Sequence, residues 1–121
     1  MTTLLIVDGA NVVGSVPDGW WKDRRGAAER LRDRLAVRAA EGVAHLVGPL
    51  DIVLVVEGAA RGVAPVPGVR IEEAAGSGDD LIAELAAGAA QECVVVTADR
   101  ELRARVTAAG ARAVGPRTVY P

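Results

Sequence analysis

The sequence predicts a single α/β domain whose central, mostly parallel sheet is covered by helices on both faces. Short apolar runs alternate along the chain with longer amphipathic segments, which is the order of elements that builds such a sheet. The runs are continuous rather than alternating, as in strands buried on both faces. With 121 residues, 50% of them hydrophobic, the chain can bury one core, so residues 1–121 are expected to form one domain.

The first half of the chain contains two expected strands and one long helix. Residues 4–7 form an apolar run that ends at Asp8, and residues 51–56 form a second run that ends at Glu57. Between them, apolar residues recur every four positions, which predicts an amphipathic helix over residues 23–41. Glycines and a proline between the first strand and this helix indicate a loop.

The second half repeats the alternation in shorter elements. We expect strands at residues 69–71, 93–97 and 111–114. Helices are expected over residues 79–91 and 99–109, where apolar residues fall on one side of each segment.

Charge is distributed unevenly along the chain. Between Lys22 and Arg38, seven basic residues stand against three acidic ones, a net charge of +4, so the rest of the chain carries −6 of the total of −2. A basic segment opposite an acidic remainder suits a protein that grips a polyanion around an acidic pocket. The alternative is a solvated helix face with ion pairs between neighbouring turns.

Other kinds of chemistry have little support in the sequence. Cys93, the only cysteine, lies in an apolar strand and is expected to be a buried structural thiol. His45, the only histidine, lies far along the chain from any paired Ser or Cys, so a catalytic triad is not supported. Neither a membrane helix of roughly 20 apolar residues nor a signal peptide is visible, so we expect a cytoplasmic protein that does not bind membranes.

Acidic residues mark the ends of the predicted strands. Asp8 and Glu57 close the first two, Asp99 follows a later one, and Asp79 and Asp80 open a helix. Because ligands bind outside the carboxyl ends of the strands in an open parallel sheet, we expect these five carboxylates to gather at one edge. Each also has a local explanation, as a turn residue, a helix cap or an acid in a first helical turn.

Five carboxylates at one edge would repel one another, at a cost on the order of several kcal/mol unless protons or cations neutralise them. Oxygen ligands without His or Cys nearby favour Mg²⁺ or Mn²⁺ over Zn²⁺. Such an ion can activate an attacking water and neutralise charge on a phosphodiester. The pattern therefore predicts a site that cleaves phosphodiester bonds.

Polar and basic residues near these acids are candidates for supporting roles. The Asn11 amide can donate to a phosphate or orient a metal-bound water, or it can simply form a turn. The Thr97 hydroxyl can serve a similar role beside Asp99, and we include it among the candidate substrate contacts. Arg24 and Arg25 are the preferred phosphate contacts, and Arg100, next to Asp99, is another candidate.

Trp20 and Trp21 directly precede the basic segment. Aromatic rings beside basic side chains commonly stack the bases of single-stranded nucleic acid. The alternatives are a hydrophobic staple that packs the loop onto the helix, or a contact between two copies in a homodimer.

Four motifs carry the acids: Val7-Asp8-Gly9-Ala10-Asn11, Val55-Val56-Glu57-Gly58, Gly78-Asp79-Asp80-Leu81-Ile82 and Val96-Thr97-Ala98-Asp99-Arg100. In this order they resemble the NYN domains of the PIN-like nucleases, which open on a DGxN motif. The resemblance extends from residue 4 to about residue 115 and is close to the bacterial YacP-like branch.

The resemblance implies a PIN-like three-layer sandwich and an endoribonuclease, dependent on Mg²⁺ or Mn²⁺, that leaves a 5′-phosphate and a 3′-hydroxyl. It implies that Asp8, Asp79 and Asp99 bind the metal, with Glu57 and Asp80 assisting. Aspartate is common in the family where this chain has Glu57, so the longer side chain is expected to act through a water. The substrate implied is RNA, either single-stranded or structured.

Two other functions are compatible with acids at strand ends. A phosphoacceptor receiver module also binds Mg²⁺ there but needs a lysine after a late strand, and the only lysine of this chain is Lys22. A catalytically silent RNA-binding scaffold of the same fold is the other alternative, against which the sequence offers only the retention of every acid.

Overall fold

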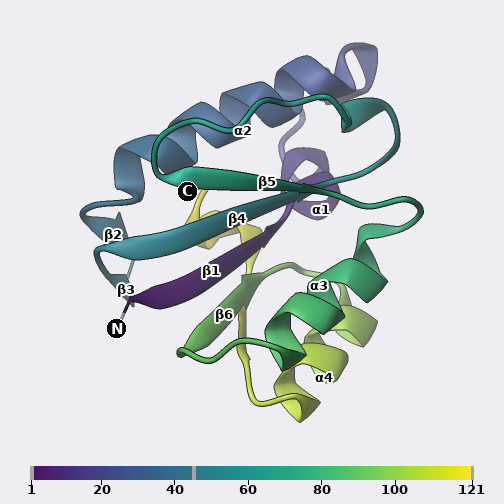
Figure 1. Cartoon of the computed structure of the whole chain (residues 1–121). Coiled ribbons are helices and arrows are strands. Elements are labelled where there is room, and N and C mark those ends of the chain that lie inside the picture. Colours follow the sequence, from purple (N-terminus) through teal and green to yellow (C-terminus); the bar gives the residue numbers. More distant parts are fainter. Residues whose placement is uncertain (1, 45, 121) are drawn as a thin grey trace.

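Five parallel strands form the centre of the computed structural model, which describes residues 2–44 and 46–120 (Figure 1). They are β1 (Thr3–Asp8), β4 (Leu50–Val56), β5 (Val69–Glu73), β6 (Cys93–Val96) and β7 (Arg112–Val114). Their order in the sheet is β5-β4-β1-β6-β7, so the first strand lies in the middle. The predicted parallel sheet is confirmed.

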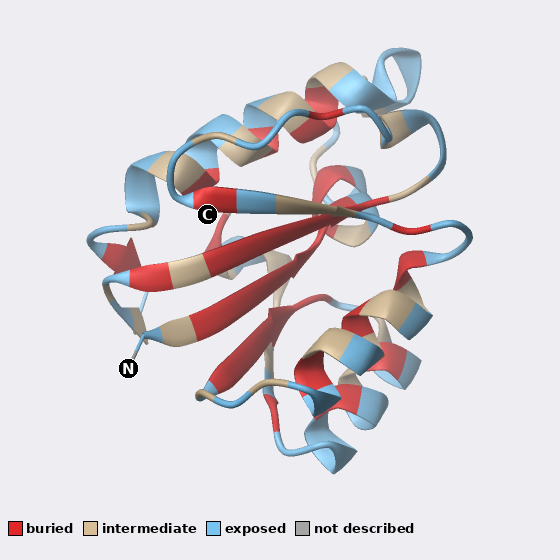
Figure 2. Cartoon of the chain, viewed as in Figure 1, coloured by how far each residue is buried: buried red, intermediate tan, exposed pale blue. Residues whose placement is uncertain are grey.

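The central position of β1 leaves all of it but Thr3 buried. Ile6 lies opposite Val53 of β4 and Val95 of β6, and all three side chains are buried. Figure 2 shows the central strands mostly in the red of buried residues. From β1 the chain builds outward through β4 to β5, then crosses back to β6 and β7 on the other side. The connections therefore diverge between β1 and β6, which is where ligands bind in open α/β sheets.

Helices cover both faces of the sheet and complete three layers (Figure 1). Residues alternate along β1 between the two cores, because successive side chains of a strand point to opposite faces. Leu5 and Val7 belong to the core beneath α1 (Gly9–Gly14) and α2 (Arg24–Arg38). Leu4 and Ile6 belong to the other core, beneath α3 (Gly78–Ala87) and α4 (Arg100–Ala108).

Several local elements differ from the sequence-based expectations. The segment predicted as a loop after β1 begins with α1, whose Val12 and Val13 are buried against the sheet. Helix α3 ends at Ala87 rather than at residue 91. Gly88, a poor helix former, provides its C-cap. Short elements that the patterns did not indicate are the hairpin strands β2 (Gly42–Val43) and β3 (Leu46–Val47), and the 3-10 turns η1 (Trp20–Lys22), η2 (Gly58–Ala60) and η3 (Pro116–Thr118).

The expectations for Cys93 and for membrane helices can be compared with the structure. Cys93 is buried in β6 as predicted, and burial raises the pKa of its thiol. His45 lies outside the described residues. None of the helices in the described part of the chain is both long enough and apolar enough to cross a bilayer.

Gly9 fixes how closely the first helix approaches the sheet. A Cβ atom at this position would lie 2.5 Å from the carbonyl oxygen of Val55 on the neighbouring strand β4. Because that oxygen belongs to the backbone, it cannot turn aside as a side chain could. Only glycine therefore lets the chain turn from β1 directly into α1 at this depth.

Gly9→Ala is expected to destabilise the protein by about 1–3 kcal/mol, the usual cost of overpacking a close contact. Gly76→Ala is the matched control, because a Cβ there would meet no atom within 4 Å. Urea denaturation would measure both. Equal stability of the two variants would show that the contact between Gly9 and Val55 does not constrain the fold.

Candidate functional site

Four of the five predicted acids lie along the carboxyl edge of three neighbouring strands. Asp8 is the last residue of β1, and Glu57 follows β4 directly. Asp99 lies just beyond β6, and Asp79 is in the first turn of α3, whose N-terminus borders the same edge. This edge includes the divergence point between β1 and β6.

Asp8 is held by two hydrogen bonds in a nearly closed environment. Only 7% of the residue is exposed to solvent. Its Oδ1 accepts a bond from the Asn11 backbone N–H at 3.4 Å and so caps α1, and its Oδ2 accepts one from the Thr97 hydroxyl at 2.9 Å. The carboxylate is therefore fixed both by its own helix and by the segment after β6.

Thr97 also connects Asp8 to Asp99. Its Oγ1 accepts a bond from the Asp99 backbone N–H at 3.2 Å while donating to Asp8. Thr97 is completely buried, so its hydroxyl offers no surface to a substrate. The expectation that Thr97 contacts substrate is corrected to a positioning role for these two acids.

Asn11 joins the same two segments through its side chain. Its amide oxygen accepts a bond from the Ala98 backbone N–H at 2.8 Å. The side chain thereby fixes α1 against the loop between β6 and α4. Its contribution is greater than that of a local turn residue, because the two bonded residues are far apart in sequence.

Asp99 and Ser77 cap the two helices of the other layer. Asp99 Oδ1 accepts bonds from the backbone N–H groups of Glu101 and Leu102, at 3.0 and 3.2 Å, and so caps α4. Ser77 Oγ accepts a bond from the Asp79 N–H at 3.3 Å and caps α3. Because Ser77 caps α3, the Asp79 carboxylate does not serve as its cap. The Glu57 carboxylate accepts a bond from the neighbouring Gly78 N–H.

The acids influence one another electrostatically. Burial raises the pKa of Asp8 to about 6; the bonds from Thr97 and Asn11 oppose the rise, and the charges of Asp79 and Glu57 add to it. The pKa of Asp79 is also raised, by burial and then chiefly by the charges of Asp99 and Glu57. Four carboxylates from separate elements therefore share one field.

These residues provide the donor chemistry of a hard divalent cation, since every candidate ligand is a carboxylate oxygen. Burial is the main cause of the raised pKa of Asp8, and a bound cation would relieve the repulsion by Asp79 and Glu57 that adds to it. Among residues 2–44 and 46–120, however, no three His, Cys, Asp or Glu side chains converge closely enough to hold a metal ion as they stand. Binding would therefore require some of the carboxylates to turn.

Asp80 contacts a basic side chain of α4. It forms an ion pair with Arg105 at 3.0 Å, in which the Asp80 side chain is largely exposed and that of Arg105 about half exposed. Its charge still adds to the field that raises the pKa of Asp79. Asp80 is thus paired with Arg105 and is a neighbour of the acidic group.

The predicted phosphate contacts occupy three different settings. Arg24 lies over the Trp20 ring, with its guanidinium carbon 5.3 Å from the ring centroid. Arg25 is exposed and lies against Gly62, and Arg100 is exposed at the first turn of α4. The three arginines therefore have different neighbours in the structure.

The rest of the basic segment makes several contacts within the protein. Arg32 pairs with Asp33 at 2.9 Å and donates to the Ala64 carbonyl oxygen, and Arg34 lies 4.6 Å from the centroid of the Tyr120 ring. Arg32 and Arg34 are therefore engaged within the protein, and none of these contacts is an ion pair between neighbouring turns of α2. The beginning of α2, where Arg24 lies, remains the part nearest the acids.

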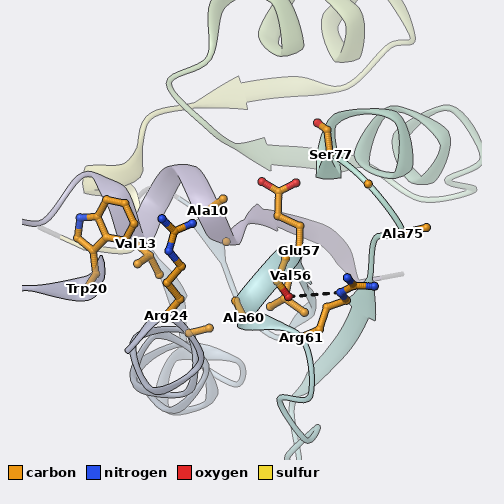
Figure 3. Close-up of a pocket in the computed structure, with 14 residues that line it drawn as sticks. Ala10, Val13, Trp20, Arg24, Val56, Glu57, Ala60, Arg61, Ala75 and Ser77 are labelled. Carbon is orange, nitrogen blue, oxygen red and sulfur yellow. Dashed lines mark hydrogen bonds between the residues drawn. The ribbon is translucent and has the colours of Figure 1, made fainter. Parts of the chain in front are cut away.

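A pocket of about 470 Å³ adjoins the acidic group (Figure 3). Glu57 and Ser77 lie on its rim next to the acids, and Trp20, Arg24 and Arg61 form its walls. Arg61 was missed by the sequence analysis. The available signal was its position four residues after Glu57, in the loop that leaves an acid-bearing strand.

Comparison with known proteins identifies the fold. No protein-family model and no curated protein matches the sequence. The crystal structure of the W164L mutant of Rae1 (YacP) from Bacillus subtilis matches with a TM-score of 0.73 and 20% identity, over 99% of this chain and 73% of that one. The structure of Rae1 (YacP) without that mutation matches with a TM-score of 0.72 and 20% identity, over 97% and 71%. The chain therefore has a YacP-like fold.

Asp8→Asn is expected to stabilise the metal-free protein at neutral pH. A raised pKa means that the folded state holds the proton more tightly than the unfolded chain, so stability is lost as the pH rises from about 4 to about 6. The loss is about 3 kcal/mol above that range for the shift from 3.8 to about 6. Denaturation of both proteins in EDTA should give a difference that is largest at pH 7.5 and absent at pH 4. A constant difference across this range would exclude the raised pKa.

Thr97→Val should raise the pKa of Asp8 further, because it removes the hydroxyl that stabilises the charged carboxylate. Thr97→Ser retains the donor and is the matched control. Carbon-detected NMR titration of the Asp8 carboxyl group would measure the shift. If valine and serine gave the same pKa, Thr97 would not position this carboxylate.

Proposed function

We propose that this chain is a metal-dependent endoribonuclease that hydrolyses RNA phosphodiester bonds. One observation carries the proposal: Asp8, Glu57, Asp79 and Asp99 share the edge of the sheet where the connections diverge, and mutual repulsion contributes to the raised pKa values of Asp8 and Asp79. The YacP-like fold and the NYN-like motifs at the same positions support it. We infer on the same grounds that the chain is a member of the YacP-like branch of the NYN domains.

In this proposal Asp8, Asp79 and Asp99 hold Mg²⁺ or Mn²⁺, and Glu57 assists through a water. The bound cation would lower the pKa of an attacking water and neutralise charge on the phosphate. Thr97 keeps Asp8 in place, as its hydrogen bond indicates. Because Arg105 engages Asp80, we assign Asp80 no direct contact and only an effect on the charge of Asp79.

The substrate is bound by basic side chains beside this edge. Arg24, near the acids, is the first candidate for a phosphate contact, with Arg25 and Arg100 as exposed contacts further out. Phosphate contacts of this kind position the RNA strand on the protein without recognising the RNA sequence. We therefore propose RNA, with single-stranded or structured regions, as the partner.

A catalytically silent RNA-binding scaffold is the second candidate. It is favoured by the failure of any three acidic side chains to converge, within the described residues, in a geometry ready for a metal ion. The two candidates make opposite predictions about hydrolysis. They make the same prediction about RNA binding.

The purified protein should cleave labelled RNA with Mn²⁺ or Mg²⁺ and not with EDTA, and its products should carry 5′-phosphates. Asp79→Asn and Asp99→Asn should each lower the rate by about 100-fold or more, since even the loss of an outer partner of a metal site costs up to that much. Asparagine at 99 can still cap α4 through its oxygen, so this variant tests the charge rather than the fold.

Glu84→Gln is the matched control, because Glu84 lies on the same helix as Asp79 and is exposed. It should cleave at the wild-type rate. Equal rates for all four proteins, or no cleavage with either metal, would exclude the proposed hydrolytic function.

A further inference from the structure

The pocket beside the acidic group has walls of two different kinds. One wall comes from α1, η1 and the start of α2, and carries Val13, Trp20 and Arg24 (Figure 3). The opposite wall comes from the segment after β4, with Arg61 beside the loop that leads into α3. Val56 contributes to the floor, and Glu57 stands between the two arginines.

Trp20 is held in place within this pocket. Its ring packs against the core on the α2 side and meets the Trp21 ring edge to face, with centroids 5.8 Å apart. The Arg24 guanidinium lies 5.3 Å from its centroid. Trp21 is 56% exposed and is not among the described residues that line the pocket. The two neighbouring tryptophans are therefore not equivalent.

Arg61 is also oriented by the fold. Its Nε donates to the Gly58 carbonyl oxygen at 3.3 Å, and Figure 3 shows the side chain on the wall opposite Arg24. Gly58 adopts a left-handed backbone with a φ of 56°, which favours glycine and turns the chain sharply after Glu57. Two guanidinium groups thus flank an apolar recess that opens beside the acids.

We propose that this pocket holds one unpaired nucleotide of the RNA, adjacent to the bond that is cleaved. The base lies in the apolar recess against Trp20, and its flanking phosphates contact Arg24 and Arg61. This inference rests on the proposed function for its substrate class, and it adds the subsite, the single-stranded requirement and the role of Arg61.

Three properties of the pocket favour this occupant. Its volume of about 470 Å³ falls in the range of about 300–1,000 Å³ for sites that enclose one small ligand, which suits one base rather than a duplex. An aromatic ring with adjacent arginines is the usual platform for stacking an unpaired base. Its rim shares Glu57 with the acidic group, so a bound nucleotide would place the next phosphate near the acids.

Tryptophan fluorescence can test the stacking directly, because Trp20 and Trp21 are the only tryptophans in the chain. Trp21→Phe leaves Trp20 as the reporter, and Trp20→Phe leaves Trp21. In EDTA, a single-stranded RNA decamer should quench the first protein strongly and the second weakly, and an abasic decamer should quench neither. Equal quenching of the two proteins, or by the abasic decamer, would overturn the proposal.

Affinity for the same decamer tests the walls of the pocket. Trp20→Ala is expected to weaken binding by about 5- to 100-fold, as for the loss of one stacked base, whereas Trp21→Ala should change it by less than about 2-fold. Arg61→Ala should weaken binding and reduce the salt slope by about one. Arg38→Ala removes an exposed charge at the far end of α2 and is the control. The affinity lost through Trp20→Ala or Arg61→Ala should be the same with and without this change.

Arg61→Ala carries the test if Trp20→Ala fails to fold, since Arg61 is exposed. A decamer paired with its complement and 5′-mononucleotides complete the set. The duplex should bind without quenching Trp20, and tighter binding of a mononucleotide than of the decamer would assign the pocket to a free nucleotide and overturn the proposal.

The two proposals fail in different ways. Cleavage that is insensitive to Trp20 and Arg61 would exclude the nucleotide pocket and leave the nuclease function intact. Binding in EDTA that depends on both residues, without cleavage in any metal, would exclude hydrolysis and leave an RNA-binding subsite.

Discussion

The buried carboxylate of Asp8 is the constraint on which the rest of the site depends. It lies at the end of the central strand, where removal from water disfavours its charge and raises its pKa to about 6. The Thr97 hydroxyl and the Asn11 backbone N–H offset part of this cost. Those two bonds connect the start of α1 to the segment after β6. The geometry of this edge therefore follows from the need to supply one buried carboxylate with hydrogen-bond donors.

Two members of the acidic group also cap helices. Asp8 and Asp99 both cap helices, as the sequence suggested for Asp99, whereas the local explanation for Asp8 was a turn. That role does not remove them from the acidic group, because Asp8 keeps a raised pKa and Asp99 acts on the pKa of Asp79. Asp79 differs, since Ser77 caps α3 in its place.

The positions of the charged side chains around the site differ from what the net charge of each segment suggests. The acidic group lies at the sheet edge, and Arg24 and Arg61 stand on the walls of the adjoining pocket. Much of the later basic segment is occupied by contacts within the protein, such as those of Arg32 and Arg34. The net charge of +4 therefore overstates what a polyanion would meet, and the position of Arg24 and Arg61 matters more than the total.

The sequence by itself determined the α/β class, the five parallel strands and the edge at which the acids gather, because these follow from hydrophobic periods and from the geometry of parallel strands. It did not reveal α1, whose six residues are too few for a clear helical period. Only the tertiary structure decided that Thr97 is a buried link to Asp8, that Asp80 turns toward Arg105, and that Arg61 shares a pocket with Trp20. The reason is physical: periodicity is a local property of the chain, whereas burial, hydrogen bonding and charge interactions depend on distances between segments that are far apart in sequence.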